Sequence, residues 1–367
     1  MEGNSTTMNF YNKIFLLASL ALMCAVSLRA QSKATAQPAP LRPRVFINPG
    51  HGGHDSNDRP EPFYNEGMQQ RVPYYESDSN LAEGQALYDI LRNKGYEVYT
   101  SRFNNTSQDD LNLFEISQMA LAYGADVFFA IHSNDTGTSR RTNIPLALFR
   151  GYTDREAAEG SKELALTVVK NLRDNQTSQW TGDGLARGDW SFYSWGYGVG
   201  LGVLRWNKVP GMLVESAFHD YLPERERFLN KDYSWNNAWI HSISLDEFFH
   251  RNGLNQGVIS GVVRYDYQRK GARVTTFGDD WYQPVNNIPV ELCTPDGTVI
   301  ASYQTDSYNN GFYSFTGLKP GNYTVEVDGA PSHPVTVKAN AATYCNITIS
   351  TIKQQGDTTS VDVDVAQ

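Results

Sequence analysis

Three residues of ligand or catalytic type each follow a short apolar run in this chain of 367 residues. His51 comes one Pro-Gly pair after residues 44–48, His132 directly follows residues 126–131, and Glu215 directly follows residues 211–214. If these runs are strands of a parallel sheet, their carboxyl ends meet at one crevice, where ligands bind in open α/β folds. The spacing therefore predicts that the three side chains converge on one site.

The residue types narrow the chemistry of that site. Two imidazoles and a carboxylate form the ligand set of a catalytic zinc ion that keeps one position open for water. Glu76 precedes a predicted helix at the mouth of the crevice, and we interpret it as the carboxylate that binds the zinc ion together with His51 and His132. Glu215 then remains as the base that takes a proton from water and returns one to a leaving amine. A single histidine at a strand end is more often structural, so the convergence carries the prediction.

Apolar periodicity and turn residues predict the elements that position these side chains. We expect helices at Asp78–Lys94, Leu113–Tyr123 and Ser234–Phe249, and another that begins at a Thr153/Glu156 capping box and reaches about Leu172. We expect strands at Arg44–Asn48, Glu97–Thr100, Asp126–Ile131, Leu146–Phe149, Val199–Leu204 and Gly211–Val214. Alternating strands and helices predict an α/β domain over residues 44–252, with a mostly parallel sheet flanked by helices.

The pattern becomes all-β after Gly253. Six short strands between residues 258 and 338 are separated by Pro-Asp-Gly, Asn-Asn-Gly and Lys-Pro-Gly turns, which predicts a small β-sandwich over residues 257–350. Its Cys293 and Cys345 could form a disulfide or remain two separate thiols, and the spacing does not decide between them. Residues 351–367 are polar and acidic and are predicted to be a disordered tail.

The first residues and the charge balance bear on location and partners. Lys13, an apolar run over residues 14–26 and a small residue at Ala30 predict a signal peptide over residues 1–30, followed by a Pro/Ala-rich linker over 31–43. The alternative is a retained membrane anchor, but the apolar run is short for a bilayer. We expect an exported protein, periplasmic or of the cell envelope or extracellular, with no membrane span after cleavage. The 31 basic and 40 acidic residues include no basic cluster, which argues against a nucleic-acid partner.

Five strings together resemble the zinc-dependent N-acetylmuramoyl-L-alanine amidases (Amidase_3 type). In chain order they are Asn48-Pro-Gly-His-Gly-Gly53, Glu76-Ser-Asp-Ser-Asn-Leu81, Tyr99-Thr-Ser-Arg102, Ala125-Asp-Val-Phe-Phe-Ala-Ile-His-Ser-Asn134 and Val209-Pro-Gly-Met-Leu-Val-Glu-Ser-Ala-Phe218. The resemblance spans about residues 44–250. It implies zinc ligation by His51, Glu76 and His132, catalysis by Glu215, and peptidoglycan as substrate. The implied reaction cuts the amide between N-acetylmuramic acid and the L-alanine of the stem peptide.

Some positions depart from the family's pattern. The 24 residues between His51 and Glu76 are more than we expect, and we interpret them as a lid or a substrate wall. Ile116 stands in the region where the family has an arginine. His54 is interpreted as an ordinary loop residue rather than a ligand, and His219 as a structural residue rather than one that contacts substrate.

The C-terminal domain, residues 257–350, resembles the carboxypeptidase-regulatory-like sandwich in strings between residues 287 and 325, and it carries no evident catalytic set. Two other functions stay open beside the amidase. One is a non-catalytic protein that binds peptidoglycan, and the other is a zinc peptidase that cuts a peptide–peptide bond of the wall. A regulatory activator protein is compatible with the family, although no motif indicates one.

Overall fold

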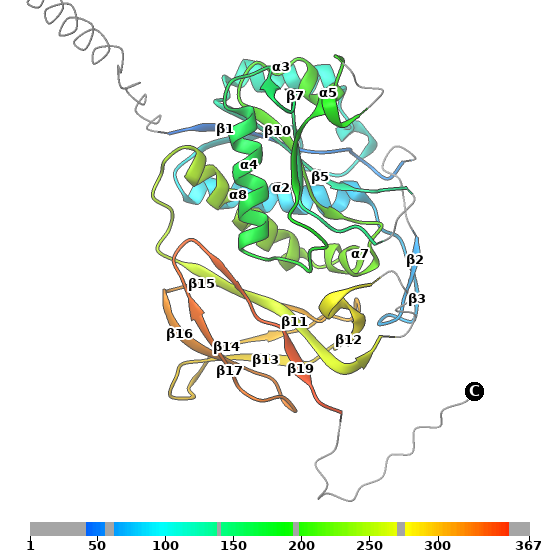
Figure 1. The fold of residues 1–367 in the computed structure, drawn as a ribbon, viewed down its shortest axis with the longest axis vertical. Coiled ribbons are helices and arrows are strands. Elements are labelled where there is room, and N and C mark those ends of the chain that lie inside the picture. The colour runs from blue at the N-terminus through cyan, green and yellow to red at the C-terminus, as the bar shows by residue number, and fades with distance from the viewer. Residues whose placement is uncertain (1–41, 56–61, 138–140, 194–197, 270–275, 352–367) are drawn as a thin grey trace, which may run out of the picture. The chain divides into compact units, whose positions relative to one another are not determined.

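The computed structural model describes residues 42–55, 62–137, 141–193, 198–269 and 276–351 (Figure 1). The predicted signal peptide, residues 31–41 of the predicted linker and residues 352–367 of the predicted tail lie outside these ranges. In the described part of the chain, no helix is both long and apolar enough to cross a membrane.

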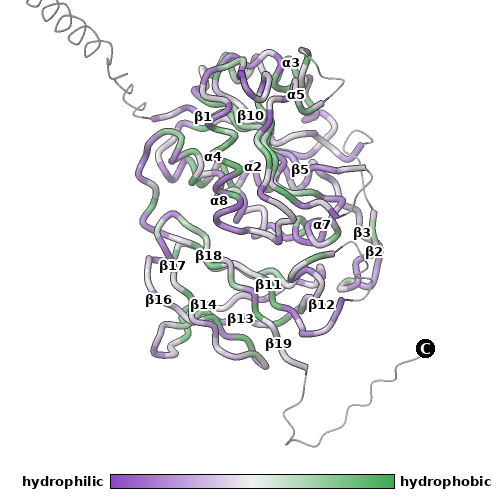
Figure 2. The backbone as a smooth tube through the Cα atoms, in the orientation of Figure 1, coloured by the Kyte–Doolittle hydropathy of each residue, from purple (hydrophilic) through white to green (hydrophobic). Residues whose placement is uncertain are grey.

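The first part of the chain is built on a six-stranded sheet with the order β4-β1-β5-β10-β6-β9. The strands are β1 (Arg44–Pro49), β4 (Glu97–Thr100), β5 (Val127–Asn134), β6 (Leu146–Phe149), β9 (Leu185–Gly188) and β10 (Gly211–Phe218). Neighbouring strands run parallel except β6, which is antiparallel to β10. The predicted mostly parallel α/β sheet is therefore confirmed. Figure 2 shows hydrophobic stretches along its central strands.

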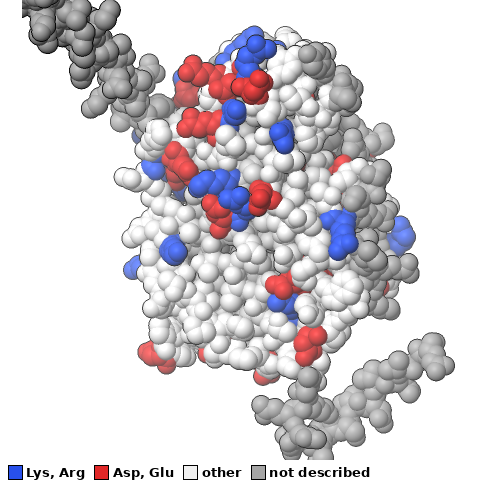
Figure 3. Space-filling view, in the orientation of Figure 1, with Lys and Arg blue, Asp and Glu red and all other residues white. Residues whose placement is uncertain are grey.

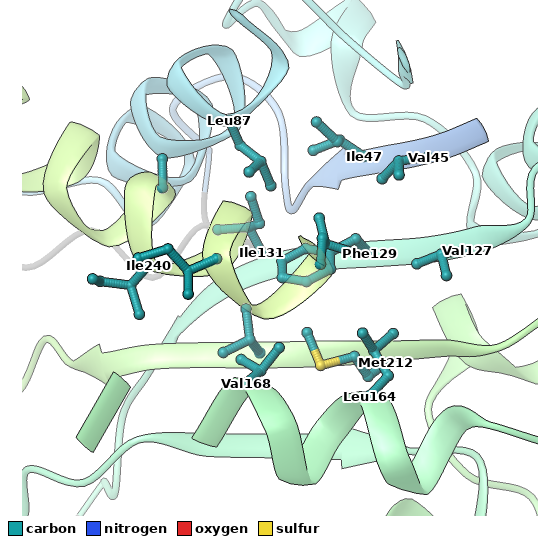
Figure 4. Close-up of a cluster of buried hydrophobic side chains, with 14 of the residues drawn as sticks. Val45, Ile47, Leu87, Val127, Phe129, Ile131, Leu164, Val168, Met212 and Ile240 are labelled. Carbon is teal, nitrogen blue, oxygen red and sulfur yellow. The ribbon is translucent and has the colours of Figure 1, made fainter. Parts of the chain in front are cut away.

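One face of this sheet is covered by three long helices: α2 (Glu76–Asn93), α4 (Ser161–Asp174) and α8 (Lys231–Phe248). Alternate side chains of the strands, such as Ile47, Phe129 and Met212, are fully buried against them (Figure 4). Burying one such side chain stabilises the fold by about 1.5–3 kcal/mol. This core holds the strands on one face of the sheet and leaves the other face accessible to fewer covering elements.

The second face has a thinner cover, made of α3 (Leu113–Tyr123) and the four-residue helix α6 (Gly202–Arg205). These helices bury Phe46, Phe128 and Leu213 of the sheet. His132 and Glu215 lie farther along the same strands, beyond this cover. The backbone of these two residues is therefore supported by the core on the first face, while their side chains project from the second face, which is less covered.

Two local predictions are wrong. Residues 199–204 do not form a strand, because the apolar run enters α6; a run this short does not distinguish a buried helix from a strand by periodicity. Helix α4 begins at Ser161, not at a Thr153 cap, and residues 151–156 form the small hairpin of β7 (Gly151–Tyr152) and β8 (Arg155–Glu156). Glu156 still caps α4, since its carboxylate accepts hydrogen bonds from the backbone N–H groups of Gly160 and Lys162.

The second part of the chain is all-β, as predicted. One sheet contains β11 (Gly257–Gln268), β12 (Tyr282–Pro284), β15 (Phe312–Leu318), β18 (Ala342–Tyr344) and β19 (Ile347–Ile349). The other contains β13 (Pro289–Cys293), β14 (Val299–Gln304), β16 (Gly321–Glu326) and β17 (His333–Val337). Apolar side chains from both sheets share one core. Cys293 and Cys345 are both free thiols.

Buried ion pairs join the two parts at α7 (Leu222–Phe228). Arg227 contacts Asp280 at 2.8 Å, and Glu226 contacts Arg269 at 2.6 Å. All four residues are nearly inaccessible to solvent. On the face shown in Figure 3, by contrast, basic and acidic side chains lie intermingled at the surface rather than gathered by sign.

Candidate metal and catalytic site

His51 lies in the turn that follows β1, in a backbone conformation that non-glycine residues seldom adopt. Its φ is +62°, in the left-handed region, which costs about 1–2 kcal/mol. The preceding Gly50 lies against the ring of His132, so a Cβ at Gly50 would come within 2.1 Å of that ring. Residues held in strained conformations cluster at functional sites. The Pro-Gly-His turn thus brings the two imidazoles together, with ring centroids 5.0 Å apart.

His132 and Glu215 are direct neighbours on adjacent parallel strands. β5 and β10 are longer than predicted, so both residues lie within the ends of their strands and not just beyond them. In the register of the two strands, Glu215 pairs with His132. Residues so paired project side by side from one face of the sheet. Glu215 is 7% exposed.

Glu76 is the first residue of α2, and its carboxylate lies between the two histidines. Its Oε2 is 3.2 Å from Nε2 of His51, and its Oε1 is 3.0 Å from Nδ1 of His132. One donor atom from each of these three residues lies within 4.8 Å of the others. In the described part of the chain, this is the one His/Cys/Asp/Glu group that could hold a metal ion.

Hydrogen bonds and charge settle the ionisation of this group. Burial acts to raise the pKa of Glu76, but the hydrogen bonds and charges of His132 and His51 outweigh it and hold that pKa well below its usual value. Burial lowers the pKa of His132, with Glu76 opposing the shift. An ionised Glu76 and a neutral His132 are the forms in which these two groups bind a metal.

The long connection between His51 and Glu76 contains a hairpin of β2 (Phe63–Asn65) and β3 (Gln70–Val72). Phe63 and Val72 belong to a buried cluster with Phe228 of α7 and Phe312 of the β-rich part. After the hairpin, the buried hydroxyl of Tyr74 bonds with Ser79 at 2.8 Å and with Ser133 at 2.9 Å. The described residues of this insertion therefore support the site from the side.

Arg102 connects the segments that carry the ligands, a role that the sequence analysis did not assign. Its Nε donates to the carbonyl of Pro49, and its Nη2 donates to the carbonyls of Gly50 and Ser77, at 2.8–2.9 Å. The side chain is 4% exposed. Arg102 thus fixes the backbone next to both His51 and Glu76.

If His51, Glu76 and His132 hold a metal ion, replacement of Arg102 by alanine is expected to weaken its binding about 10- to 100-fold, the range typical of groups that orient metal ligands. The carbonyls next to His51 and Glu76 would lose their common donor. Arg102→Lys should recover only part of the affinity, because one ammonium cannot reproduce the planar fork. Competition with a chromophoric chelator measures the dissociation constant for added zinc. Equal zinc affinity in all three proteins would contradict this role.

The other candidate residues lie apart from the three-donor group. Nε2 of His54 is 3.0 Å from Asp78, and its ring stacks on Tyr75 at 3.8 Å. His219 is 1% exposed and its Nδ1 contacts the hydroxyl of Ser133 at 2.9 Å, which favours a structural role.

A cavity of about 210 Å³ opens beside the two histidines. Its apolar lining comes from α3 and α6, from residues just before these helices, and from β10 beneath them: Leu111, Leu113, Ile116, Leu201, Val203 and Leu213. Ile116, at the position noted above for its departure from the family, is thus part of an apolar wall. The cavity can hold an apolar group next to His51 and His132.

A buried carboxylate, Asp220, follows the end of β10. Burial raises its pKa to about 6, hydrogen bonds from Thr136 oppose the rise, and the charge of Asp135 adds to it. In the unfolded chain the same carboxyl ionises near pH 4. Between about pH 4 and pH 6 the unfolded state therefore releases its proton first, and this residue's contribution to stability is lost as the pH rises.

Asp220→Asn should remove this contribution. The unaltered protein loses this contribution between pH 4 and pH 7, whereas the variant does not, because asparagine has no proton to release. The melting temperature of the variant minus that of the unaltered protein should therefore be larger at pH 7 than at pH 4. Thermal unfolding at both pH values tests this. Asp183→Asn, which removes a negative charge from a side chain that is 96% exposed, is the control. A difference between Asp220→Asn and the unaltered protein that does not change with pH would contradict the assignment.

The fold and this group define a class of protein: an α/β domain with a His/Glu/His group that could hold a metal ion, next to a second carboxylate. The sequence model of the N-acetylmuramoyl-L-alanine amidase family matches residues 45–244, which is more than half of the chain, and the chain belongs to this family of enzymes. The model of the SdrD B-like domain matches residues 259–367. The β-sandwich is therefore confirmed, with this as its matching family.

The relatives are distant. The chain is 23% identical over 218 residues to N-acetylmuramoyl-L-alanine amidase CwlM of Bacillus licheniformis, covering 58% of this chain and 67% of the relative. It is 24% identical over 236 residues to the uncharacterised protein YqiI of Bacillus subtilis (strain 168), covering 64% of this chain and 98% of YqiI. Among solved structures, the amidase AmiC2 of Nostoc punctiforme is similar with a TM-score of 0.44 and 20% identity, covering 57% of this chain and 98% of AmiC2.

Proposed function

We propose that this protein is a zinc-dependent hydrolase that cuts the amide between N-acetylmuramic acid and the L-alanine of the peptidoglycan stem peptide. The observation that carries the proposal is the group of His51, Glu76 and His132 next to Glu215, in a chain of the amidase family. The division into a catalytic domain (44–252) and a sandwich (257–350) is part of the proposal.

The donor set fits zinc. Two imidazole nitrogens and one carboxylate leave a fourth position of a tetrahedral ion open to water or substrate. A zinc ion held by His51, Glu76 and His132 would polarise the scissile carbonyl and lower the pKa of water. The Ser133 backbone N–H and the Asn80 amide also donate to Oε1 of Glu76, which orients the carboxylate.

Glu215 supplies the proton transfers. Its carboxylate projects from the strand next to His132, so it can take a proton from the attacking water at the edge of the three-donor group. The same carboxyl then returns that proton to the nitrogen of the L-alanine as the C–N bond breaks. The amine leaves neutral, and Glu215 is ionised again for the next cycle.

The apolar cavity beside the histidines supports recognition of a substrate with small aliphatic groups next to the scissile bond. The lactyl group and the L-alanine each carry a methyl group on the carbon next to that amide. A cavity lined by leucine, isoleucine and valine side chains suits such groups because their burial is favourable.

Incubation of the purified protein with peptidoglycan, followed by mass spectrometry of the soluble products, tests the proposal. We expect free stem peptides that begin with L-alanine, their loss after treatment with a chelator, and their return when zinc is added. Products cleaved within the peptide would instead support a wall peptidase. Intact peptidoglycan with stoichiometric zinc in the protein would support a non-catalytic peptidoglycan-binding protein.

The proposed substrate agrees with the predicted export of the chain, since peptidoglycan lies outside the cytoplasmic membrane. Periplasmic, envelope and extracellular locations all fit it. Control by a regulatory activator protein remains part of this proposal, and the digestion assay addresses it directly: weak release of peptides by the pure protein would indicate that a partner is needed.

A further inference from the structure

A buried polar cluster lies behind the strand that carries Glu215. Ser216 donates its hydroxyl hydrogen to Oε1 of Glu83 on α2 at 2.6 Å, and Nε2 of His241 on α8 contacts the same oxygen at 2.7 Å. The Ser216 hydroxyl and Nε2 of His241 are 3.1 Å apart. None of the three residues is more than 1% exposed. The proposed mechanism uses none of them.

The cluster is not a nucleophilic triad, although it contains a serine, a histidine and a glutamate. In a triad, the serine and the carboxylate contact opposite nitrogens of the imidazole. Here both contact Nε2, while Nδ1 of His241 has no hydrogen-bond partner among the described residues. The lack of exposure also keeps substrate away from the serine. Another role must account for the cluster.

Stability does not account for it either. Removing a carboxylate and an imidazole from water costs free energy, and apolar residues of similar volume often serve a core as well or better. The ring of His241 lies in such a core, with its centroid 5.2 Å from that of Phe129. What the hydrogen bonds among Glu83, Ser216 and His241 add is one fixed geometry.

The geometry that it fixes is that of the strand end. The pairing of β10 with β5 shifts between Glu215 and Phe218, so β10 has a bulge that includes Ser216. Bulges next to active sites redirect side chains. Successive residues of a strand point to opposite faces, so Glu215 faces the metal ligands while Ser216 faces α2 and α8.

Glu83 connects the same cluster to the ligand helix. It follows Glu76 by seven residues, which is about two turns, so both lie on one face of α2. The helix thus holds a metal ligand near its start and the bulge of β10 farther along. A hydrogen bond at Ser216 therefore sets where Glu215 lies relative to Glu76.

We propose that Glu83, Ser216 and His241 are positioning residues that hold the bulge of β10 and thereby aim the carboxylate of Glu215 at the three-donor group. The proposal rests on the proposed amidase function. Displacement of a reacting group by about 1 Å costs up to about 100-fold in rate. Loss of the cluster should therefore lower kcat about 10- to 100-fold.

Two variants and one rescue test this with peptidoglycan as substrate. Ser216→Ala and the double variant Glu83→Leu/His241→Leu should show the lower kcat with unchanged KM and full zinc content. The double variant should melt at the same temperature or higher, because apolar residues replace a buried polar pair. Glu83→Gln keeps an acceptor for both donors, so its kcat should stay close to that of the unaltered protein. Ser244→Ala is the control, because it removes a buried hydroxyl on α8 that donates to the Ile240 carbonyl and is not part of the cluster.

An unchanged kcat in Ser216→Ala with full zinc content would overturn the proposal, whether or not the double variant folds. So would activity that simply follows melting temperature across the series, since that is the behaviour of a structural cluster. If the unaltered protein releases no L-alanine-terminated peptides, the proposed function fails and this inference fails with it. If the unaltered protein is active and the variants match it, only this inference fails.

Discussion

Replacement of Glu215 by glutamine is expected to lower kcat for peptide release about 10²- to 10⁴-fold, the range that general acid–base catalysis contributes. Glutamine keeps the size of the side chain but cannot accept a proton from water or return one to the leaving amine. Because Glu215 lies outside the His51, Glu76 and His132 group, bound zinc should remain stoichiometric. Peptide release measured by mass spectrometry and zinc measured by atomic emission separate the two effects.

Glu163→Gln is the matched control for this variant. Glu163 lies in the first turn of α4 and is exposed, so its replacement changes the same chemical group far from the strand ends. An active Glu215→Gln protein would mean that another group moves the proton. Loss of zinc in Glu215→Gln would instead make Glu215 part of the metal site.

Replacement of Glu76 by alanine is expected to weaken zinc binding by more than about 100-fold and to abolish peptide release. Loss of an outer group that only orients a ligand already costs 10- to 100-fold, and loss of a ligand itself should cost more. The change also leaves the buried N–H of Ser133 without its acceptor, which costs about 1–3 kcal/mol of stability. Chelator competition gives the zinc affinity, and thermal unfolding gives the change in stability.

Asp78→Asn is the control here, because Asp78 lies two residues farther along the same first turn and outside the three-donor group. It should keep its zinc. If Glu76→Ala binds zinc as tightly as the unaltered protein, then Glu76 is not a ligand. The short contacts of Glu76 with both histidines would in that case be ordinary hydrogen bonds within a structural cluster.

The sequence was sufficient to predict where the ligand candidates meet. Parallel strands end on one edge, so apolar runs that lead to His51, His132 and Glu215 predict their convergence without a structure. Glu76 depended more on the family resemblance, because nothing in local periodicity relates a helix start to a histidine that precedes it by 24 intervening residues. The structure brings its carboxylate to within 3.2 Å of both histidines.

Other features depended on tertiary geometry that no local pattern encodes. Arg102 acts through three carbonyls that come together only when the turn after β1 meets the start of α2. The contacts of Glu83 with His241 join residues 158 positions apart. The α6 helix was predicted as a strand because a helix of four residues is too short to show a helical period in the sequence. Glu156 was assigned to the wrong cap because it lies at the end of the β7–β8 hairpin, from which its side chain reaches forward to the backbone N–H groups of Gly160 and Lys162.

The buried ion pairs at α7 bear on how this chain can be divided or recombined. Cutting the chain before Gly257 would remove Arg269, the partner of Glu226, and Asp280, the partner of Arg227. Both charges on α7 would then be exposed near the strand that carries Glu215. The same cut would remove Phe312 from the apolar cluster that it forms with the β2–β3 hairpin. The sandwich is therefore not an interchangeable module: an amidase fragment taken alone, or a chimaera with a different C-terminal domain, would expose unpaired charges and apolar side chains near the strand that carries Glu215.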